Sequence, residues 1–564
     1  MKIDFIILFF FYFSSIVSTF GYGSYLQKII NIPFNKKCLG YSGLIGFFFL
    51  TIYSYFSNFF YDHNVYHNLI ILIFGLYLFY LKNLEKLFSK KNIKIIIFIF
   101  LFIFLSFLIF KSHDDFPYYH FPYTYYLTQN SSFIGVGQFN HGFRTPSSLF
   151  YFNSLFYLPI IKFHLFHIGS AILYGSTIYI FFSNLLESIQ KKKINYFYYY
   201  NLLVLIFIIV FFYRLAEHGT DRSAQILILL IITEIFKIFT KKRISHFEIS
   251  KISILFAITI SLKAFYFLYG LLLLPLLFIV SKRIGFNNLM KKVFINRTFY
   301  FSLLLLTFVL ITNFFNTGCL IYPLTNSCFT DFDWSIQTKE IEMMALHYEG
   351  WSKAGKGPNF VVDDINNYVT DFNWVNNWLN KYFFFKVSDF LLGLVVLIIV
   401  LFGTFYSKIT IKKTLNKEII YLYFTIIILL IEWFINHPAL RYGGYSLIAL
   451  SFFIPFSLVL EKYENNINSI KKKTFIIILI TITIFGLRNI DRIIKENKKY
   501  NYNVFLNPYY KVDSTYFRIQ KKINKITMNY KNCQKGKDEC NDNDEFFVKS
   551  KNGKYIFVRK KDKF

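Results

Sequence analysis

The sequence predicts an all-α polytopic integral membrane protein with about 12–14 transmembrane helices. Of the 564 residues, 55% are hydrophobic and 22% are aromatic, and the mean hydropathy is +0.42. A water-soluble domain would expose too much of this apolar surface. Apolar runs long enough to cross about 30 Å of hydrocarbon recur along the chain. These observations exclude a soluble enzyme, a disordered chain and a fibre.

We predict fourteen crossings from these apolar runs. They are 3–22, 41–60, 67–81, 95–110, 163–185, 200–213, 223–239, 252–262, 265–280, 299–315, 389–406, 419–435, 443–460 and 474–487. The pair within 252–280 is short for two complete crossings, so a single tilted helix or a broken, re-entrant element is the alternative there. The first run is predicted to be an uncleaved helix with its N-terminus outside, and a cleaved signal peptide is the alternative.

If two crossings lie within 252–280, basic clusters follow every second predicted crossing, and such clusters mark the cytoplasmic side of a membrane. They lie at 82–94, 191–193, 241–243, 282–297, 412–417 and 471–473. The formal net charge of +30 is therefore attributed to topology and to contact with the lipid bilayer, and no nucleic-acid partner is predicted. This orientation places 112–162, 214–222, 316–388, 436–442 and 488–564 outside the cytoplasm.

The chain is predicted to have a transmembrane domain at 1–487 and a C-terminal extracytoplasmic soluble tail at 488–564. The tail contains an amphipathic stretch near 515–530. It ends in a predicted β-hairpin over 546–558, in which an Asn-Gly pair at 552–553 forms the turn.

The five cysteines provide an independent test of this topology. Cys319 and Cys328 share one predicted outside loop, and Cys533 and Cys540 share the outside tail, so each pair is a disulfide candidate in an oxidising compartment. The alternative is that all four are unpaired thiols. Cys38 lies in a predicted inside loop, where a free thiol is ordinary.

Two adjacent carboxylates, Asp114 and Asp115, follow directly after the predicted crossing at 95–110, on the outer side. Like charges at this spacing raise one pKa, and burying them at an interface is costly. Such a pair suits a catalytic general base or a divalent cation, for which Mg²⁺ or Mn²⁺ is the candidate. The alternative is a hydrophilic edge that only ends the helix.

Other outside loops bring His, Arg and carboxylate side chains to about the same membrane depth, and arginine suits a phosphate because its planar fork binds two oxygens. Lys263 lies between two apolar halves, where an intramembrane cation is a functional candidate and snorkelling to the interface is the alternative. The candidate substrate-binding residues are His113, His120, Tyr118, Tyr119, His141, Arg144, Glu217, His218, Asp221, Arg222, Lys263, His437 and Arg441.

Two outside segments have a predicted surface role. The segment 147–161 is expected to form an amphipathic helix on the membrane surface, with Thr145 or Ser147 as its N-cap. The loop 316–388 contains four of the five tryptophans together with several carboxylates, a composition typical of sugar-binding surfaces. Anchoring of the loop in the headgroup region is the alternative. These tryptophans are Trp334, Trp351, Trp374 and Trp378.

The run Asp114-Asp115-Phe116-Pro117-Tyr118-Tyr119 resembles the acidic motif that opens the first large outside loop of GT-C class polytopic membrane glycosyltransferases. Protein O-mannosyltransferases and the aminoarabinose and lipid A-modifying transferases are of this kind. The resemblance implies a sugar donor linked to a polyprenyl phosphate and a glycan, lipid or protein acceptor. It also implies the cytoplasmic (inner) membrane of a bacterium, with the active site on the periplasmic side.

By this resemblance, Asp114 or Asp115 takes the proton of the acceptor hydroxyl, and the other orients it or holds the metal. The donor phosphate meets Arg222, Arg441 or Lys263, which stabilise the leaving group. His113 and His120 assist, and the loop 316–388 and the tail hold the acceptor.

Three other functions are weighed against this hypothesis. An O-antigen polymerase or ligase would depend on an outside arginine and tolerate loss of the Asp pair. A transporter or flippase for a lipid-linked sugar would show inverted repeats, and the sequence has none that we detect. A structural assembly subunit would tolerate replacement of each loop residue.

Overall fold

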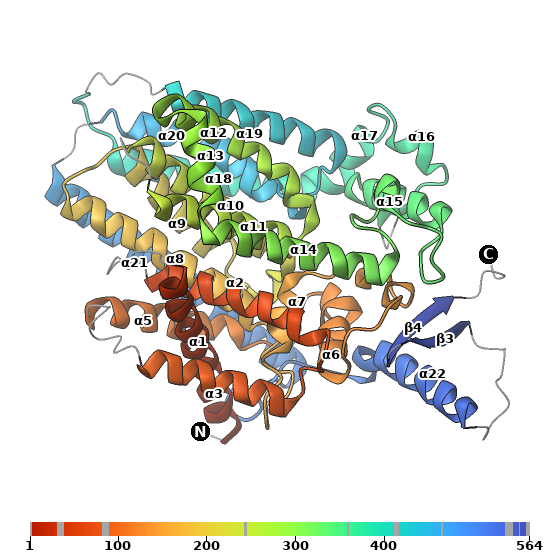
Figure 1. Ribbon diagram of the computed structural model, residues 1–564. Coiled ribbons are helices and arrows are strands. Elements are labelled where there is room, and N and C mark those ends of the chain that lie inside the picture. Colours follow the sequence, from red (N-terminus) through yellow and green to blue (C-terminus); the bar gives the residue numbers. More distant parts are fainter. Residues whose placement is uncertain are drawn as a thin grey trace.

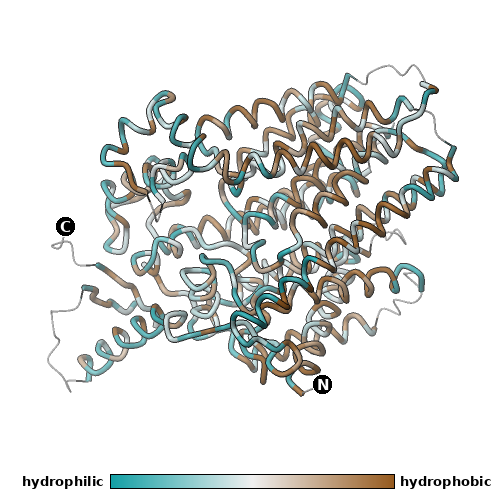
Figure 2. The backbone as a smooth tube through the Cα atoms, turned by 180° about the vertical axis from the view of Figure 1, so that it is seen from behind, coloured by the Kyte–Doolittle hydropathy of each residue, from teal (hydrophilic) through white to brown (hydrophobic). Residues whose placement is uncertain are grey.

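The computed structural model describes residues 3–30, 39–81, 90–241, 245–357, 360–410, 417–463, 466–535, 545–551 and 553–559. Long helices run side by side through the molecule (Figure 1). Their middle portions are apolar, and hydrophilic segments gather towards the two ends (Figure 2). Parts of the predicted basic loops, at 82–89, 242–244 and 411–416, lie outside the described residues.

A helix overlaps every predicted crossing, which confirms the all-α polytopic membrane fold. Among the described residues, eight helical stretches are long and apolar enough to cross a membrane, and α3, α9 and α20 are shorter apolar helices. The long elements are α1 (Ile3–Ile29), α2 (Leu39–Asn58), α3 (Val65–Leu81), α5 (Lys90–Phe107), α8 (Ile168–Gln190), α9 (Tyr196–Phe211), α10 (Gly219–Phe239), α11 (His246–Leu262), α12 (Leu273–Ile284), α14 (Arg297–Thr317), α18 (Ser388–Phe405), α19 (Lys417–Asn436), α20 (Gly444–Leu460) and α21 (Ile467–Tyr500).

Short elements connect these helices, most of them at the end of the bundle that is predicted to face outside, which we call the outer end. Before α8 they are η1 (Phe116–His120), α6 (Phe121–Gln129), η2 (Val136–Gln138), η3 (His141–Phe143) and α7 (Ser148–Ser154). Further along are η4 (Leu215–Glu217), η5 (Ala264–Leu272), α13 (Phe286–Phe294), η6 (Thr325–Ser327), α15 (Thr338–Ser352), β1 (Lys356–Gly357), β2 (Phe360–Val361), α16 (Ile365–Val369), α17 (Val375–Trp378), η7 (Leu379–Val387) and η8 (Leu440–Tyr442). The tail forms η9 (Ser514–Phe517), α22 (Arg518–Gln534), β3 (Phe546–Lys551) and β4 (Lys554–Arg559).

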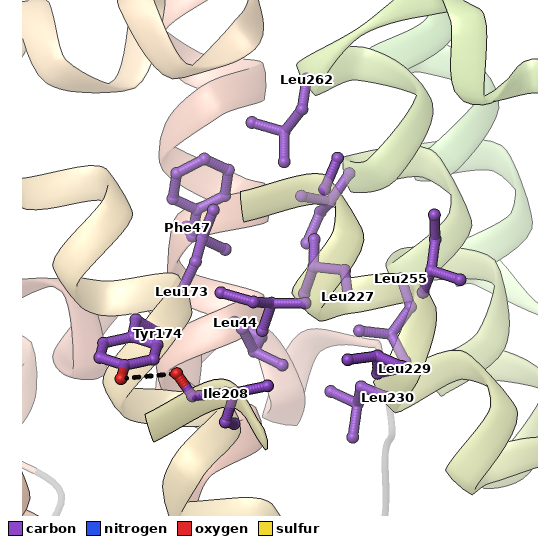
Figure 3. Packing of buried hydrophobic residues seen from close by; sticks show 14 of the residues in the cluster. Leu44, Phe47, Leu173, Tyr174, Ile208, Leu227, Leu229, Leu230, Leu255 and Leu262 are labelled. Carbon is purple, nitrogen blue, oxygen red and sulfur yellow. Dashed lines mark hydrogen bonds between the residues drawn. The ribbon is translucent and has the colours of Figure 1, made fainter. Parts of the chain in front are cut away.

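The core lies where α2, α8, α9, α10 and α11 pack together. Figure 3 shows Leu44 and Phe47 of α2 near Leu173 of α8 and Leu227 of α10, all fully buried. Tyr174 donates a hydrogen bond of 3.0 Å to the backbone carbonyl of Ile208, so its hydroxyl is satisfied inside the bundle. Because lipid tails are as apolar as these side chains, close packing and internal hydrogen bonds hold the helices together.

Small residues allow α1 to approach α2 and α3 closely. A Cβ atom on Gly46 would overlap the carbonyl oxygen of Thr19, and one on Gly21 would overlap that of Gly75. Glycine at such contacts lets two backbones meet, as small residues do in many membrane bundles.

The uncertain region 252–280 is a broken element. The helix α11 ends at Leu262, and Lys263 is extended, with φ −160° and ψ 121°. The 3₁₀ segment η5 and helix α12 follow. The break places the amine of Lys263 at the outer end of the bundle, beside α10.

The expectation of a surface helix over 147–161 is wrong. The helix expected over 147–161 ends at Ser154, and all its residues are buried, so it packs into the core and does not lie on the membrane surface. Ser147, and not Thr145, is its N-cap, accepting a hydrogen bond from the amide of Leu149. The expected division between domains at 487 and 488 falls inside α21, which continues to Tyr500.

The tail expectations are confirmed in part. The amphipathic stretch is α22, and β3 and β4 form the antiparallel hairpin, although Asn552 lies outside the described residues. The hairpin is bonded to the first outside loop, because the amide of Phe557 donates to the carbonyl of Ile134 at 2.9 Å. Figure 1 shows the hairpin and α22 at one end of the molecule. The tail therefore supports the loop that carries the acidic pair.

The loop 316–388 differs from the expected sugar-binding surface of tryptophans. Trp374 and Trp378 are buried against Phe434, so they belong to the core. Cys319 and Cys328 form the expected disulfide. Cys38 and Cys540 lie outside the described residues, so the expected Cys533–Cys540 pair stays a prediction.

We predict that Gly46→Val disrupts the contact between α1 and α2, because the added carbons meet the backbone of Thr19. The cost is about 1–3 kcal/mol of stability, as for other overpacked cores. Thermal unfolding of the detergent-solubilised protein measures it. Gly403→Val is the matched control, since a Cβ there meets no described atom within 4 Å. Equal loss in both variants would contradict the role of close packing.

Candidate functional site

Four charged side chains from four separate segments meet at the outer end of the bundle. Arg441 of η8 donates from Nη2 to Asp115 Oδ2 at 2.7 Å and from Nε to Asp221 Oδ2 at 3.0 Å. The ammonium of Lys263 pairs with the other carboxylate oxygen of Asp221. We call Lys263, Asp221, Arg441 and Asp115 the ion-pair chain. Its members are far apart in the sequence, so only the fold brings them together.

The helix start of α10 and the turn after η8 hold Asp221 and Arg441 in the ion-pair chain. Asp221 lies in the first turn of α10, where the helix dipole favours a carboxylate. Gln225, one turn further along α10, donates to the carbonyl of Arg441 at 3.1 Å and accepts from the amide of Ser446 at 3.0 Å. Gly443 has φ +100°, and a Cβ there would overlap the hydroxyl of Tyr269, so the turn after Arg441 requires glycine.

Aromatic rings cover the cations of the chain. The guanidinium of Arg441 lies 5.2 Å from the ring centroid of Trp351 on α15, and the amine of Lys263 lies 4.5 Å from that of Tyr442. Cations at these distances are attracted to the ring faces. The side chains of Asp115, Lys263 and Arg441 are each 26% exposed. The ion-pair chain is therefore shielded from most of the solvent but still reachable by a ligand.

The electrostatics keep Asp115 ionised. Burial by itself would raise the pKa of Asp115, but the nearby guanidinium of Arg441 outweighs burial, and the pKa falls below its ordinary value. Burial lowers the pKa of His120 to about 3, so this imidazole is neutral at pH 7. Among the described residues its Nε2 atom has no hydrogen-bond partner. The site thus combines a carboxylate with a neutral histidine.

The two adjacent aspartates have different surroundings. Asp115 joins the ion-pair chain, whereas the side chain of Asp114 is 89% exposed and lies 3.6 Å from Lys111. They are therefore not arranged as a shared ligand pair for Mg²⁺ or Mn²⁺. Within the described ranges, no group of three or more His, Cys, Asp or Glu side chains has the arrangement of a metal site.

Several predicted residues surround the chain. His113 Nδ1 lies 3.7 Å from Asp115 Oδ2, and burial raises the pKa of Tyr119, which also interacts electrostatically with Asp115. His437 packs against Phe265, with ring centroids 5.3 Å apart. The placement of His113, Tyr119, His120 and His437 agrees with the sequence hypothesis that these loops share one site.

Other predicted residues have structural partners elsewhere. Arg222 and Arg214 share Glu217, at 3.2 and 2.8 Å, outside the ion-pair chain. His218 is buried, and its Nε2 lies 2.5 Å from the carbonyl oxygen of Phe212.

The remaining three predicted residues, Arg144, Tyr118 and His141, tie the first outside loop to other segments. Arg144 is bonded to Tyr322 at 2.5 Å and paired with Glu340, which joins the two large outside loops. The hydroxyl of Tyr118 lies 3.2 Å from His141 Nε2. The guanidinium of Arg518 lies 5.1 Å from the centroid of the Tyr118 ring. These contacts hold the outside loop 112–162 against the loop 316–388 and the tail.

Gln225 and Tyr442 were not predicted as parts of the site, and Trp351 was predicted only as one of four tryptophans of a sugar-binding surface. A polar residue inside the apolar run of α10 was the available signal for Gln225, because a buried amide needs partners. Trp351 was grouped with three other tryptophans, and nothing in the sequence distinguishes it from the two that enter the core.

The fold and the charged outer site together define a polytopic membrane protein with a site at one face of the bundle. Residues 5–448 match the model of a family described as "Domain of unknown function (DUF8201)", and the chain belongs to this family. No curated protein and no solved structure matches the chain. The matched region contains the whole ion-pair chain and ends before α21.

We predict that Arg441→Gln destabilises the protein by about 1–3 kcal/mol, because it leaves Asp115 and Asp221 without their shared partner. Thermal unfolding in detergent measures the loss. Arg214→Gln is the control: the side chain of Arg214 is 45% exposed, and its pair is expected to contribute less than about 1 kcal/mol. The double variant Asp221→Asn, Arg441→Gln should lose less than the sum of the two single changes, and strict additivity would contradict the coupling.

The ion-pair chain should also be sensitive to acid. The folded pKa of Asp115 is lowered, so its stabilising contribution is complete above the unfolded value of about 3.9 and disappears as the pH falls through the folded pKa. We expect the unfolding temperature to drop more steeply below about pH 4 in the unmodified protein than in Asp115→Asn. Identical pH profiles would show that Asp115 is not paired in the folded protein.

Proposed function

We propose that the protein is a membrane glycosyltransferase that moves a sugar from a polyprenyl-phosphate donor to an extracytoplasmic acceptor. The position of Asp115 carries the proposal: an ionised, shielded carboxylate lies at the outer end of the helices, beside cations and a neutral histidine. One of its oxygens is bonded to Arg441, and no hydrogen bond to the other oxygen, Oδ1, exists within the described part of the chain. That oxygen is free to accept a hydrogen bond from a hydroxyl.

In the proposed reaction, the acceptor hydroxyl gives its proton to Asp115 while its oxygen attacks the anomeric carbon of the sugar. The bond from that carbon to the phosphate oxygen breaks, and polyprenyl phosphate leaves as an anion. Cationic groups of the site stabilise this developing charge. Because the pKa of Asp115 is lowered, it is a weak base, and its contribution is expected to be on the order of 10²-fold.

The loop 316–388 is proposed to hold the acceptor, whether glycan, lipid or protein. Trp351 covers Arg441, and the loop is fastened to the first outside loop through Arg144, Tyr322 and Glu340. An aromatic ring over a charged site suits the apolar face of a sugar ring. The proposed setting is the inner membrane of a bacterium, with the site on the periplasmic side. No divalent cation has a role in the proposed reaction, because Asp114 and Asp115 are not arranged as a shared ligand pair.

One observation favours a second candidate, an O-antigen polymerase or ligase. Arg441 is the central member of the ion-pair chain, with a carboxylate on each side. In such an enzyme the arginine would bind the lipid-linked substrate, and Asp115 would only orient the arginine. The same variants distinguish the two candidates.

We predict that Asp115→Asn lowers sugar transfer at least about 10²-fold, because the amide cannot accept the proton. Asp114→Asn is the matched control, and it should keep most of the activity because the Asp114 side chain lies outside the ion-pair chain and is exposed. The measurement is the surface glycan profile, by mass spectrometry, of a deletion strain that carries each variant, with membrane expression verified.

Two outcomes would contradict the proposal. If Asp115→Asn restores the glycan while Arg441→Gln does not, the polymerase or ligase is favoured. If neither change has an effect although deletion alters the glycan, a transporter or an assembly subunit is favoured.

A further inference from the structure

A charged cavity lies beside the ion-pair chain. It has a volume of about 660 Å³ and is bounded by the segment after α5, by residues 213–217 and by the last turns of α21. Its described lining includes six basic side chains and four carboxylates. These are Lys111, Arg214, Arg488, Arg492, Lys495 and Lys499, with Asp114, Glu217, Asp491 and Glu496. His113 also lines the cavity and lies 3.7 Å from Asp115, so it stands between the cavity and the ion-pair chain.

The basic side chains of the cavity outnumber its carboxylates, so the cavity has a net positive charge. Each carboxylate lies within 3.7 Å of a basic group: Asp114 of Lys111, Glu217 of Arg214, Asp491 of Lys495 and Glu496 of Arg492. Arg488 and Lys499 form no ion pair within the described residues. Arg488 uses one N–H to donate to the carbonyl of Val210 at 2.8 Å, so further N–H groups remain for a ligand.

The cavity lining also contains a buried hydrogen-bond donor, Arg492. Arg492 is 9% exposed and donates to the carbonyls of Leu105 and Leu108 at 3.1 and 2.7 Å, while its Nε atom has no partner in the described part of the chain. Because two backbone carbonyls hold this guanidinium in place, its positive charge stays at the cavity. Arginine with lysine suits a phosphate, since one supplies paired donors and the other a point charge.

The surface next to the cavity is apolar. Leu487, Ile490 and Ile494 on α21 are 61%, 46% and 49% exposed, on the same turns as Arg488, Asp491 and Lys495. Leu487 ends the predicted crossing, so this apolar face starts at the edge of the hydrocarbon and continues into the headgroup region, where a lipid phosphate lies. A cationic cavity beside an exposed apolar face suits a molecule with a phosphate at one end and a hydrocarbon chain at the other.

We propose that this cavity binds the phosphate group of a membrane lipid, whose hydrocarbon chain lies along the exposed apolar face of α21. The cavity suits this role better than Arg441 and Lys263, because Asp115 and Asp221 already neutralise those two cations. This binding site does not depend on the proposed transfer reaction. Under that reaction the lipid is the polyprenyl-phosphate donor, and His113 separates its phosphate from Asp115.

The test measures binding of farnesyl phosphate to the full-length, detergent-solubilised protein by calorimetry. Arg488→Gln and Lys499→Gln should each weaken binding on the order of tenfold, because each removes one charge-assisted contact. Lys498→Gln is the matched control: Lys498 is the exposed neighbour of Lys499 and does not line the cavity. Unchanged binding in both cavity variants, or an equal loss in Lys498→Gln, would overturn the site. Elution of each variant by size exclusion verifies its folding.

Two further ligands identify what the cavity recognises. Inorganic phosphate and farnesol should each bind more than about tenfold more weakly than farnesyl phosphate, because each lacks half of the recognised molecule. Equal affinity for inorganic phosphate would mean a site for free phosphate, and equal affinity for farnesol would mean that only the apolar face binds; either result overturns the proposal. Asp115→Asn should bind farnesyl phosphate normally, so failure of transfer with intact binding concerns the reaction alone.

Discussion

The outer end of the molecule depends on the pairing of Asp221 with Arg441 and Lys263. Each of these charges is partly removed from water, and a shielded charge without a partner is costly. The pairing therefore requires the first turn of α10, the break after α11 and the turn at η8 to keep one arrangement. Gln225 adds neutral hydrogen bonds between α10 and η8, and Asp115 extends the network to the first outside loop.

The helices α10 and α11 are joined by ion pairs at both ends. At the outer end Asp221 meets Lys263, and towards the other end the buried Glu234 pairs with Lys251. At the far end of α10, Arg283 donates to the carbonyls of Ile238 and Phe239 and so satisfies the end of the helix. Since two separated ion pairs resist sliding and rotation of one helix against the other, the break at Lys263 holds its position.

The ion-pair chain and the charged cavity are neighbouring parts of one outer surface with different chemistry. In the chain, every cation has a carboxylate partner, and the remaining capacity is that of a hydrogen-bond acceptor, Asp115. In the cavity, cations are in excess and lie next to apolar residues of α21. One part thus suits a hydroxyl and the other a lipid phosphate, and His113 contacts both. The tail supports this surface, because the amide of Lys511 donates to the carbonyl of Phe110 at 2.9 Å.

The sequence by itself determined the membrane fold and the positions of the long helices, because hydropathy acts locally. Turn residues and short cysteine spacing made the C-terminal hairpin and the Cys319–Cys328 disulfide candidates. It also identified the loops that carry Asp115, Asp221, Lys263 and Arg441. Only the tertiary structure decided that Asp115 turns inward and Asp114 outward, that Trp374 and Trp378 fill the core, and that 148–154 is buried. These outcomes depend on which distant segments become neighbours, and periodicity along the chain carries no information about that.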